Sequence, residues 1–245
     1  MNVYVAEFLG TALLILLGNG VVANVLLKQT KGHGSGWLVI TTGWGLAVFT
    51  AVLCFADVSG AHINPAVSIG LAMAGVFKWA QVPGFVAAQM LGAIAGGALV
   101  FLFYKDHYSV TDDADAKLAT FCNTPAIHNP PLNLFCEAIG TFVLVYAVLM
   151  FGEGGVRVDG GEHVKVGLGS LGAPLVGMIV FAIGISLGGT TGYAINPARD
   201  LGPRIAHALL PVPGKRDPDW GYSWIPVVGP ILGGIAAAGL YLMGT

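Results

Sequence analysis

The tripeptide Asn-Pro-Ala occurs twice, each time within an apolar stretch of the chain. Its six residues are Asn64, Pro65, Ala66, Asn196, Pro197 and Ala198. Asparagine is favoured as the cap before a helix, and proline suits the first helical position because its missing N–H would have no partner there. Each tripeptide therefore predicts the start of a helix. The asparagine oxygen can hold the turn while the amide hydrogens donate to a passing oxygen atom.

Two ordinary helix starts are the alternative interpretation of these tripeptides. That alternative does not explain why both starts lie at matched positions of a repeated sequence with apolar surroundings. The amino end of a helix carries roughly half a positive charge, and two such ends aimed at one point oppose cations and protons. We therefore favour a site that presents two amide donors to a small uncharged molecule.

Two carboxylates, Glu7 and Glu137, also lie within apolar stretches. An unpaired carboxylate is costly inside a membrane, so each one requires a partner. One acid at the equivalent position of each repeat favours a structural role, in which the carboxylate accepts hydrogen bonds from the backbone of a re-entrant loop. A proton-coupling site is the alternative. His62, two residues before Asn64, is either a structural hydrogen-bonding residue or a pore-lining one.

The sequence contains no convincing nucleophile–base pair or cluster of metal ligands, so we expect no enzyme, no cofactor and no metal. The cysteines are odd in number and lack metal-ligand spacing, which favours reduced packing residues; they are Cys54, Cys122 and Cys136. The net charge is −2, and no basic patch with interleaved aromatic residues is present. Nucleic-acid binding is therefore not expected.

The composition shows what kind of element must position these groups. Of the 245 residues, 55% are hydrophobic and only 10% are charged, and the mean hydropathy is +0.77. Soluble domains carry about 25% charged residues, so this balance is typical of a membrane protein. The first apolar stretch has no Lys or Arg before it and is too long for a signal peptide, so we expect it to be a membrane span.

Six stretches reach the roughly 20 residues that a helix needs to cross the hydrocarbon core. They cover residues 4–27, 37–56, 82–104, 132–152, 171–190 and 222–243. Two further apolar stretches, 65–76 and 197–207, would extend only about 18 and 16 Å at 1.5 Å per residue. Meeting end to end, they would make a seventh, broken span. The prediction is an all-α membrane protein with six transmembrane helices plus two re-entrant half-helices.

Three sequence features recur in the same order, which indicates an internal repeat. One of these features is Asn-Pro-Ala. Before it in each repeat, Glu7, Gly10 and Thr11 match Glu137, Gly140 and Thr141. After it, Gly92, Gly96 and Gly97 match Gly229, Gly233 and Gly234. We expect a single channel domain, 1–245, in which repeat one covers about 1–104 and repeat two about 132–245. Since each repeat holds three full spans, the second copy must be inverted relative to the first.

The inverted arrangement predicts a pore. The half-helices enter from opposite faces, and irregular backbone at membrane depth is tolerated only where protein or a water-filled cavity satisfies its polar groups. The two Asn-Pro-Ala turns should therefore line that cavity. The polar connection 105–131 is long enough to lie across one mouth, and the Gly-rich segment 153–170 is expected to be an aqueous loop.

These motifs resemble the signature loops of the major intrinsic protein family, which includes aquaporins and glycerol channels. The resemblance covers nearly the whole chain and rests on SGAHINPAVS and TGYAINPARDLGPR. Asp200 directly follows the second Asn-Pro-Ala-Arg, and this feature resembles the glycerol-conducting branch of the family, the bacterial glycerol facilitators. We expect Asp200, like Glu7, Glu137 and His62, to support the loops. The resemblance implies an aquaporin-like fold, a homotetramer with one pore per subunit, and a multi-pass location in the cell membrane with cytoplasmic termini.

The resemblance also implies a selectivity filter at Trp44, Gly184, Tyr193 and Arg199. The two aromatic side chains would form apolar walls for the C–H side of a polyol, and Arg199 would donate to its hydroxyl groups. Gly184 replaces the His of water-selective relatives and would leave space for a three-carbon alcohol. Tyr193 stands where glycerol facilitators mostly carry Phe, so its hydroxyl either narrows the lumen or points into a neighbouring span. The alternatives are interfacial aromatics, a membrane-surface arginine and a close-packing glycine.

The distribution of basic residues opposes the orientation that the resemblance implies. Cytoplasmic termini would put three Lys and Arg residues inside (Lys78, Arg157, Lys165) and eight outside (Lys28, Lys31, Lys105, Lys117, Arg199, Arg204, Lys215, Arg216). Cytoplasmic loops normally hold the excess. Setting aside Arg199 and Arg204 as pore-loop residues still leaves six against three, yet we keep the family topology.

The expected function is a channel for the facilitated diffusion of glycerol and water that excludes ions and protons. One alternative is a water-preferring aquaporin, and another is a channel mainly for other small neutral solutes such as urea, dihydroxyacetone or protonated lactic acid. A proton-coupled transporter is a further alternative, because broken helices and inverted repeats also occur in that class.

Overall fold

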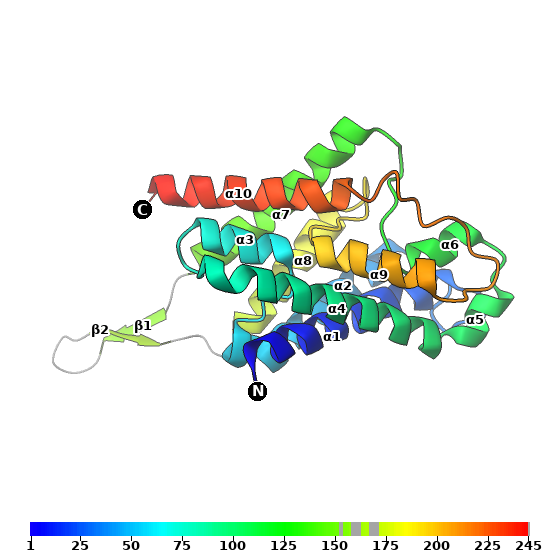
Figure 1. Ribbon diagram of the computed structural model, residues 1–245, viewed down its shortest axis with the longest axis horizontal. Coiled ribbons are helices and arrows are strands. Elements are labelled where there is room, and N and C mark those ends of the chain that lie inside the picture. Colours follow the sequence, from blue (N-terminus) through cyan, green and yellow to red (C-terminus); the bar gives the residue numbers. More distant parts are fainter. Residues whose placement is uncertain (152–153, 158–162, 167–171, 245) are drawn as a thin grey trace.

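The computed structural model describes residues 1–151, 154–157, 163–166 and 172–244 (Figure 1). Five helical segments in this part are long and apolar enough to cross a membrane. They are α1 (Val3–Leu26), α2 (Trp37–Ser59), α4 (Val82–Phe103) with the 3₁₀ turn Trp79–Gln81 before it, α7 (Pro130–Met150) and α10 (Ile225–Gly244). The predicted membrane-spanning, helical architecture is confirmed.

The sixth predicted span, 171–190, is a shorter helix than expected. It corresponds to α8 (Gly172–Leu187), whose 16 residues extend about 24 Å. The predicted end was wrong because Gly188 and Gly189 begin a run of turns after Leu187. Residue 171 lies outside the described residues.

The two predicted half-helices are α3 (Pro65–Met73) and α9 (Pro197–Leu209). The first ends three residues earlier than expected because Ala74 and Gly75 turn the chain, Gly75 with φ +78° in the left-handed region. The second continues two residues further. Figure 1 shows α3 and α9 roughly in line, with their amino ends facing each other near the middle of the molecule.

The connections contain structure that the sequence did not predict. The segment 105–131 forms two short helices, α5 (Lys105–Val110) and α6 (Ala114–Ala119). The segment 153–170 includes the antiparallel strands β1 (Gly154–Arg157) and β2 (His163–Val166), which make a hairpin that extends from the helical body. The all-α prediction therefore holds for the helical body, with this hairpin added. The predicted loop residues 153, 158–162 and 167–170 lie outside the described residues.

The two repeats pack in the same way, through the glycines that the sequence repeats. A Cβ atom added to Gly92 would lie 2.2 Å from the carbonyl oxygen of Phe8, and one added to Gly233 would lie 2.1 Å from that of Ala138. No side chain fits at these positions, so α4 approaches α1, and α10 approaches α7, backbone to backbone. The equivalent contact in each half supports the inverted-repeat architecture.

The glycines next to these contacts, Gly97 and Gly234, pack against the half-helices. A Cβ atom on Gly97 would lie 3.2 Å from Pro203 in α9, and one on Gly234 would lie 2.7 Å from the carbonyl oxygen of Ala66 in α3. Half-helix α9 thus packs on α4 and half-helix α3 on α10, so each half-helix contacts a span of the other repeat. The two half-helices therefore lie between the repeats and pack against both of them.

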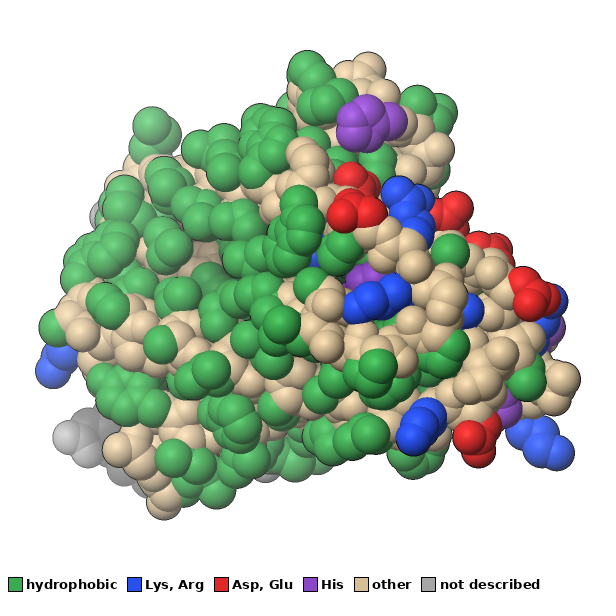
Figure 2. All heavy atoms as spheres, turned by 45° about the vertical axis from the view of Figure 1, so that its right-hand side comes forward, with side chains coloured by type: hydrophobic (Ala, Val, Ile, Leu, Met, Phe, Trp, Pro, Cys, Tyr) green, Lys and Arg blue, Asp and Glu red, His purple; other side chains and the backbone are tan. Residues whose placement is uncertain are grey.

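The outer surface divides into apolar and charged regions. Figure 2 shows hydrophobic side chains over most of one face, while Lys, Arg, Asp and Glu gather toward the end that carries α5 and α6. Large apolar side chains such as Phe103 and Leu209 are more than three-quarters exposed. Such a surface suits lipid tails and makes the chain a multi-pass membrane protein.

Candidate functional site

The two asparagines cap the half-helices. The side-chain oxygen of Asn64 accepts a hydrogen bond from the N–H of Ala66 at 2.9 Å. The side-chain oxygen of Asn196 accepts from Ala198 at 3.0 Å and from Arg199 at 3.2 Å. Proline at the first helical position brings no N–H that would need a partner there. The local sequence therefore sets both helix starts.

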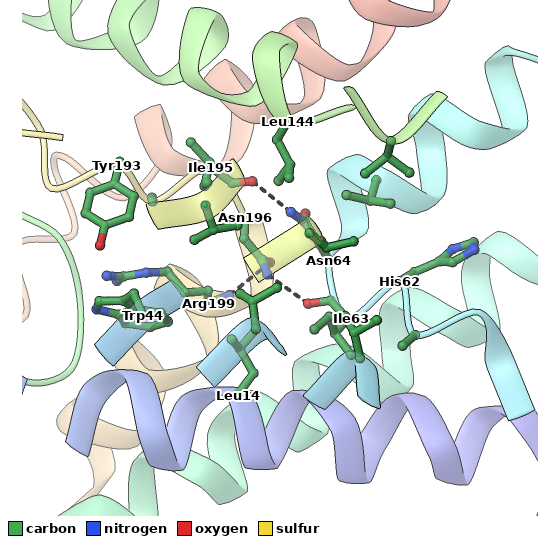
Figure 3. A pocket seen from close by; sticks show the side chains of 18 of the residues that line it. Leu14, Trp44, His62, Ile63, Asn64, Leu144, Tyr193, Ile195, Asn196 and Arg199 are labelled. Atoms are coloured by element: carbon green, nitrogen blue, oxygen red, sulfur yellow. Dashed lines mark hydrogen bonds between the residues drawn. The ribbon is translucent and has the colours of Figure 1, made fainter. Parts of the chain in front are cut away.

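The remaining polar atoms of the asparagines join the two loops. The side-chain nitrogen of Asn64 donates to the carbonyl oxygen of Ile195 at 2.8 Å, and that of Asn196 donates to the carbonyl oxygen of Ile63 at 2.8 Å (Figure 3). We expected the amide hydrogens of both residues to face the lumen. One hydrogen of each amide is used instead by the opposite loop, which leaves one per asparagine for a passing molecule.

The loops before the asparagines adopt matching strained conformations. Ala61 and Ile63 have φ of 45° and 44°, and Tyr193 and Ile195 have φ of 41° and 43°. Non-glycine residues with positive φ are uncommon, and each costs on the order of 1–3 kcal/mol. The same two positions before each asparagine are strained, so the two loops share one backbone path. Such a path persists only where the surroundings hold it.

Glu7 holds the first loop. One carboxylate oxygen accepts from the Ser59 hydroxyl at 2.7 Å and from the His62 N–H at 2.9 Å. The other accepts from the Ile63 N–H and from the Gln89 side chain, both at 2.7 Å. Glu7 is fully buried, so these four donors replace the water it has lost. Ser59 and Gln89 carried no signal in the sequence.

Glu137 holds the second loop in the equivalent way. Its carboxylate oxygens accept from the N–H groups of Ala194 at 3.0 Å and Ile195 at 2.8 Å. Both glutamates therefore contact the loop that precedes a half-helix, and both are buried. These contacts favour the structural interpretation of the two acids over a proton-coupling site.

His62 has features of both roles considered for it. Its Nδ1 atom lies 3.0 Å from the Ser68 hydroxyl, and its ring lies 4.5 and 4.9 Å from the rings of Phe77 and Phe85. The residue also lines the cavity beside the asparagines. His62 is thus both fixed by hydrogen bonding and exposed to the lumen.

A cavity of about 110 Å³ passes the two asparagines (Figure 3). Its walls are mainly aliphatic side chains, such as Leu14, Val48, Leu144 and Val180. The polar side chains among its lining are few: His62, Asn64, Asn196, Arg199 and Tyr193. No described residue donates a hydrogen bond to the carbonyl oxygens of residues 61, 62, 193 and 194, so these acceptors remain free along the strained loops.

A second cavity of about 220 Å³ lies on the side of α6. It shares only Trp44, Tyr193 and Arg199 with the first cavity, so these three side chains form the boundary between the two. Trp44, Tyr193 and Arg199 are three of the four residues at which the family resemblance implies a selectivity filter, and that filter stays a prediction. Asp200 lies behind the boundary and lines neither cavity.

Trp44 and Arg199 are held face to face. The central guanidinium carbon lies 4.1 Å from the centre of the Trp44 ring, a cation–π contact. Trp44 in turn rests on Gly18, where an added Cβ atom would lie 2.3 Å from the ring. Within the described residues, the indole nitrogen of Trp44 has no hydrogen-bond partner. The boundary therefore combines the Trp44 and Tyr193 rings with the N–H groups of Arg199, and the guanidinium covers one face of Trp44.

Gly184 takes a different place from the one expected. It lines neither cavity, because the ring of Tyr193 fills the space beside it. A Cβ atom added to Gly184 would lie 2.7 Å from Cζ and 2.8 Å from the hydroxyl oxygen of Tyr193. The glycine makes room for this ring rather than widening the lumen directly. The Tyr193 hydroxyl has no partner among the described residues.

A buried polar network supports Arg199 from behind. Asp200 and Arg204 form an ion pair, with the carboxylate 2.8 Å from Nη2, and neither side chain is exposed. Asp200 also accepts a 2.7 Å hydrogen bond from the N–H of Asn123 in the connection 105–131. The side-chain oxygen of Asn123 accepts from the guanidinium of Arg199. Asn123 carried no signal in the sequence.

Exposed ion pairs hold the end of the molecule near the second cavity. Lys28 lies 2.6 Å from Asp112, and Arg216 pairs with Asp115. The hydrogen bond from Lys28 lowers the pKa of Asp112 below its ordinary value. Exposed pairs of this kind contribute little to stability.

Comparison with known proteins agrees with this geometry. A family model described as major intrinsic protein matches residues 1–241. The chain is 59% identical over 241 residues to a probable glycerol uptake facilitator protein of Thermotoga maritima, covering 98% of each chain. It is 51% identical over 237 residues to a glycerol uptake facilitator protein of Streptococcus pneumoniae, covering 97% of each. The X-ray structure of the aquaglyceroporin from Plasmodium falciparum superposes with a TM-score of 0.81 at 34% identity, covering 97% of this chain and 93% of that one.

Proposed function

The chain belongs to the major intrinsic protein family, and we propose that it is a membrane channel for the facilitated diffusion of glycerol and water. The observation that carries this proposal is the boundary between the two cavities, where aromatic rings lie beside the hydrogen-bond donors of Arg199. A molecule with hydroxyl groups on one side and C–H groups on the other suits such a boundary.

Passage requires no covalent step. In this proposal a glycerol molecule slides its carbon side along the aromatic rings and the aliphatic wall that Arg199 leaves uncovered, while its hydroxyl groups accept hydrogen bonds from Arg199. At the centre the free amide hydrogens of Asn64 and Asn196 take over, and the free carbonyl oxygens of the strained loops accept hydrogen bonds. Each polar group of the permeant thus finds a partner as the previous one is lost.

Exclusion of ions and protons follows from charge. The amino ends of α3 and α9 face each other, and each carries roughly half a positive charge. Arg199 adds a full charge at the constriction. Cations meet this positive region without a compensating carboxylate among the cavity-lining residues, because Glu7 and Glu137 are committed to the loops. We also propose that the orientation which two central donors impose on water prevents proton transport.

The arrangement of the whole molecule is part of the proposal. We propose one channel domain over residues 1–245, with repeat one at about 1–104, the connecting loop at 105–131 and repeat two at about 132–245; the matched glycine contacts of the two halves support it. Family membership further supports a homotetramer in the lipid bilayer of the cell membrane, with a pore in each subunit and cytoplasmic termini.

A swelling assay on reconstituted vesicles tests the function. Vesicles that hold the protein should take up glycerol and water faster than protein-free vesicles, and glycerol uptake at the protein-free rate would overturn the proposal. An imposed pH gradient separates a channel from a proton-coupled transporter. Uphill glycerol accumulation that a protonophore abolishes would favour the transporter, whereas a channel only equilibrates glycerol.

A further inference from the structure

Asn123 uses every hydrogen-bonding group it has. Its N–H donates to Asp200 at 2.7 Å, and its side-chain nitrogen donates to the carbonyl oxygen of Thr191 at 2.9 Å. Its carbonyl oxygen accepts from Arg204 at 2.9 Å, and its side-chain oxygen accepts from Arg199. The residue is buried and lines the second cavity, so it links the connecting loop directly to the constriction.

The contact with Arg199 is the informative one. Among the described residues, Asn123 is the only hydrogen-bond acceptor of the Arg199 guanidinium, whose face rests on Trp44. The contact with the Trp44 ring fixes the plane of the guanidinium, and the hydrogen bond to Asn123 fixes its rotation within that plane. The remaining N–H groups are then directed by these two contacts.

We propose that Asn123 is a positioning residue for Arg199 and thereby sets the preference of the channel for glycerol over water. This inference rests on the proposed function and adds a specificity determinant to it. Glycerol must meet the donors of Arg199 and the aromatic wall in one orientation, so a displaced guanidinium costs it contacts. Water is smaller and needs no matched wall, so its passage depends less on where the donors point.

The test compares glycerol and water permeability of the same vesicles. In Asn123→Ala we expect glycerol permeability to fall roughly fivefold, equivalent to about 1 kcal/mol, which is part of one hydrogen bond to a charged group. Water permeability should change less than about twofold, so the glycerol-to-water ratio falls. Asn123→Asp keeps an acceptor for Arg199 and should retain a ratio close to that of the wild type.

Asn19 offers a matched control in the same loop contact region. Its side-chain nitrogen donates to the carbonyl oxygen of Phe121 at 3.0 Å, two residues before Asn123, and it does not contact Arg199. Asn19→Ala therefore loosens the loop without touching the constriction, and the ratio should stay at the wild-type value. A ratio that falls equally in Asn19→Ala and Asn123→Ala would overturn the proposal, as would an unchanged ratio in Asn123→Ala.

Size-exclusion profiles in detergent show whether each variant folds. If Asn123→Ala does not fold, Asn123→Gln takes its place, because it keeps the amide but moves the oxygen by one methylene. A wild-type ratio in Asn123→Gln would then overturn the proposal, and a lowered ratio supports it. Wild-type vesicles that fail to conduct glycerol would instead overturn the proposed function itself, so the two failures are distinct.

Discussion

The side-chain nitrogen of Asn64 lies 2.8 Å from the carbonyl oxygen of Ile195, across the interface of the two repeats. The inverse bond, from Asn196 to Ile63, has the same length. Each half-helix tip is therefore tied to the loop that leads into the other. Two short helices, neither of which crosses the membrane alone, are joined into one unit.

This relationship predicts the effect of Asn64→Asp. Aspartate still caps the half-helix but cannot donate to Ile195, so two oxygen atoms face each other and a buried carbonyl loses its partner. We expect a loss of about 1–3 kcal/mol in unfolding free energy, measured as a lower melting temperature in detergent. Asn196→Asp should behave alike. Asn133→Asp is the control, since Asn133 donates to the carbonyl of Ile127 at 3.2 Å in a partly buried contact away from the half-helix tips; an equal fall in its melting temperature would contradict the assignment.

The two loop-supporting glutamates should differ in their sensitivity to substitution. Glu7 accepts four hydrogen bonds, two from side chains, whereas Glu137 accepts two from backbone N–H groups and one from the Thr191 side chain. Glutamine puts an NH₂ group in place of one oxygen and opposes the donors on that side. Each lost hydrogen bond to a charged group costs on the order of 1.5–3 kcal/mol. We expect Glu7→Gln to lower the melting temperature more than Glu137→Gln, and the reverse order would refute this explanation.

Tyr193 provides a prediction about the width of the constriction. Its hydroxyl oxygen lies beside Gly184, without a partner among the described residues, at the boundary of the two cavities. Tyr193→Phe removes that atom and should raise glycerol permeability by roughly twofold without loss of stability. Tyr222→Phe is the matched control: this hydroxyl is also buried and unpartnered in the described chain, but Tyr222 lines neither cavity. Its removal should leave glycerol uptake unchanged.

A larger side chain at Gly184 should lower glycerol permeability, in contrast to the increase expected for Tyr193→Phe. Any side chain here must displace Tyr193, because even a Cβ atom would lie 2.7 Å from its ring. Gly184→His should therefore reduce glycerol permeability more than water permeability in the swelling assay. Gly189→His tests the size effect alone, since an added Cβ atom there meets nothing within 4 Å. Equal losses of glycerol and water in Gly184→His would count against a role of Gly184 in making room for the Tyr193 ring.

The sequence predicted those parts of the molecule that a short motif or a repeated spacing of residues determines. Asn-Pro-Ala specifies a helix start by itself, and repeated glycines mark helix contacts wherever they lie, so the half-helices, the inverted repeats and the family were predictable. The family and the glycerol relatives confirm the channel prediction. Asn123 was not predictable, because its four contacts come from segments far apart in the chain. The early end of α8 was missed because the glycine and threonine residues 188–192 carry no charge that would mark the end of the apolar stretch.

The buried ion pair behind the constriction yields the sharpest stability prediction. Asp200 and Arg204 lie 2.8 Å apart with no exposed surface, so Asp200→Asn leaves a buried charge without its counter-charge. Breaking such a pair costs about 3–5 kcal/mol, whereas an exposed pair contributes little. Asp112→Asn tests this contrast, because Asp112 pairs with Lys28 at 2.6 Å in an exposed position. The melting temperature of the Asp112→Asn variant should match that of the wild type.

The exposed pair also has a defined pH dependence. Lys28 lowers the pKa of Asp112, so any contribution of this pair is present above the ordinary carboxylate pKa and is lost as the pH falls through the lowered value. Thermal melts of wild type and Asp112→Asn should therefore coincide at low pH and differ little at neutral pH. Asp200→Asn should melt far below both at neutral pH, because its partner Arg204 cannot lose its proton there. Melting of Asp200→Asn at the wild-type temperature would show that the guanidinium finds sufficient acceptors in the carbonyl groups of the surrounding loops.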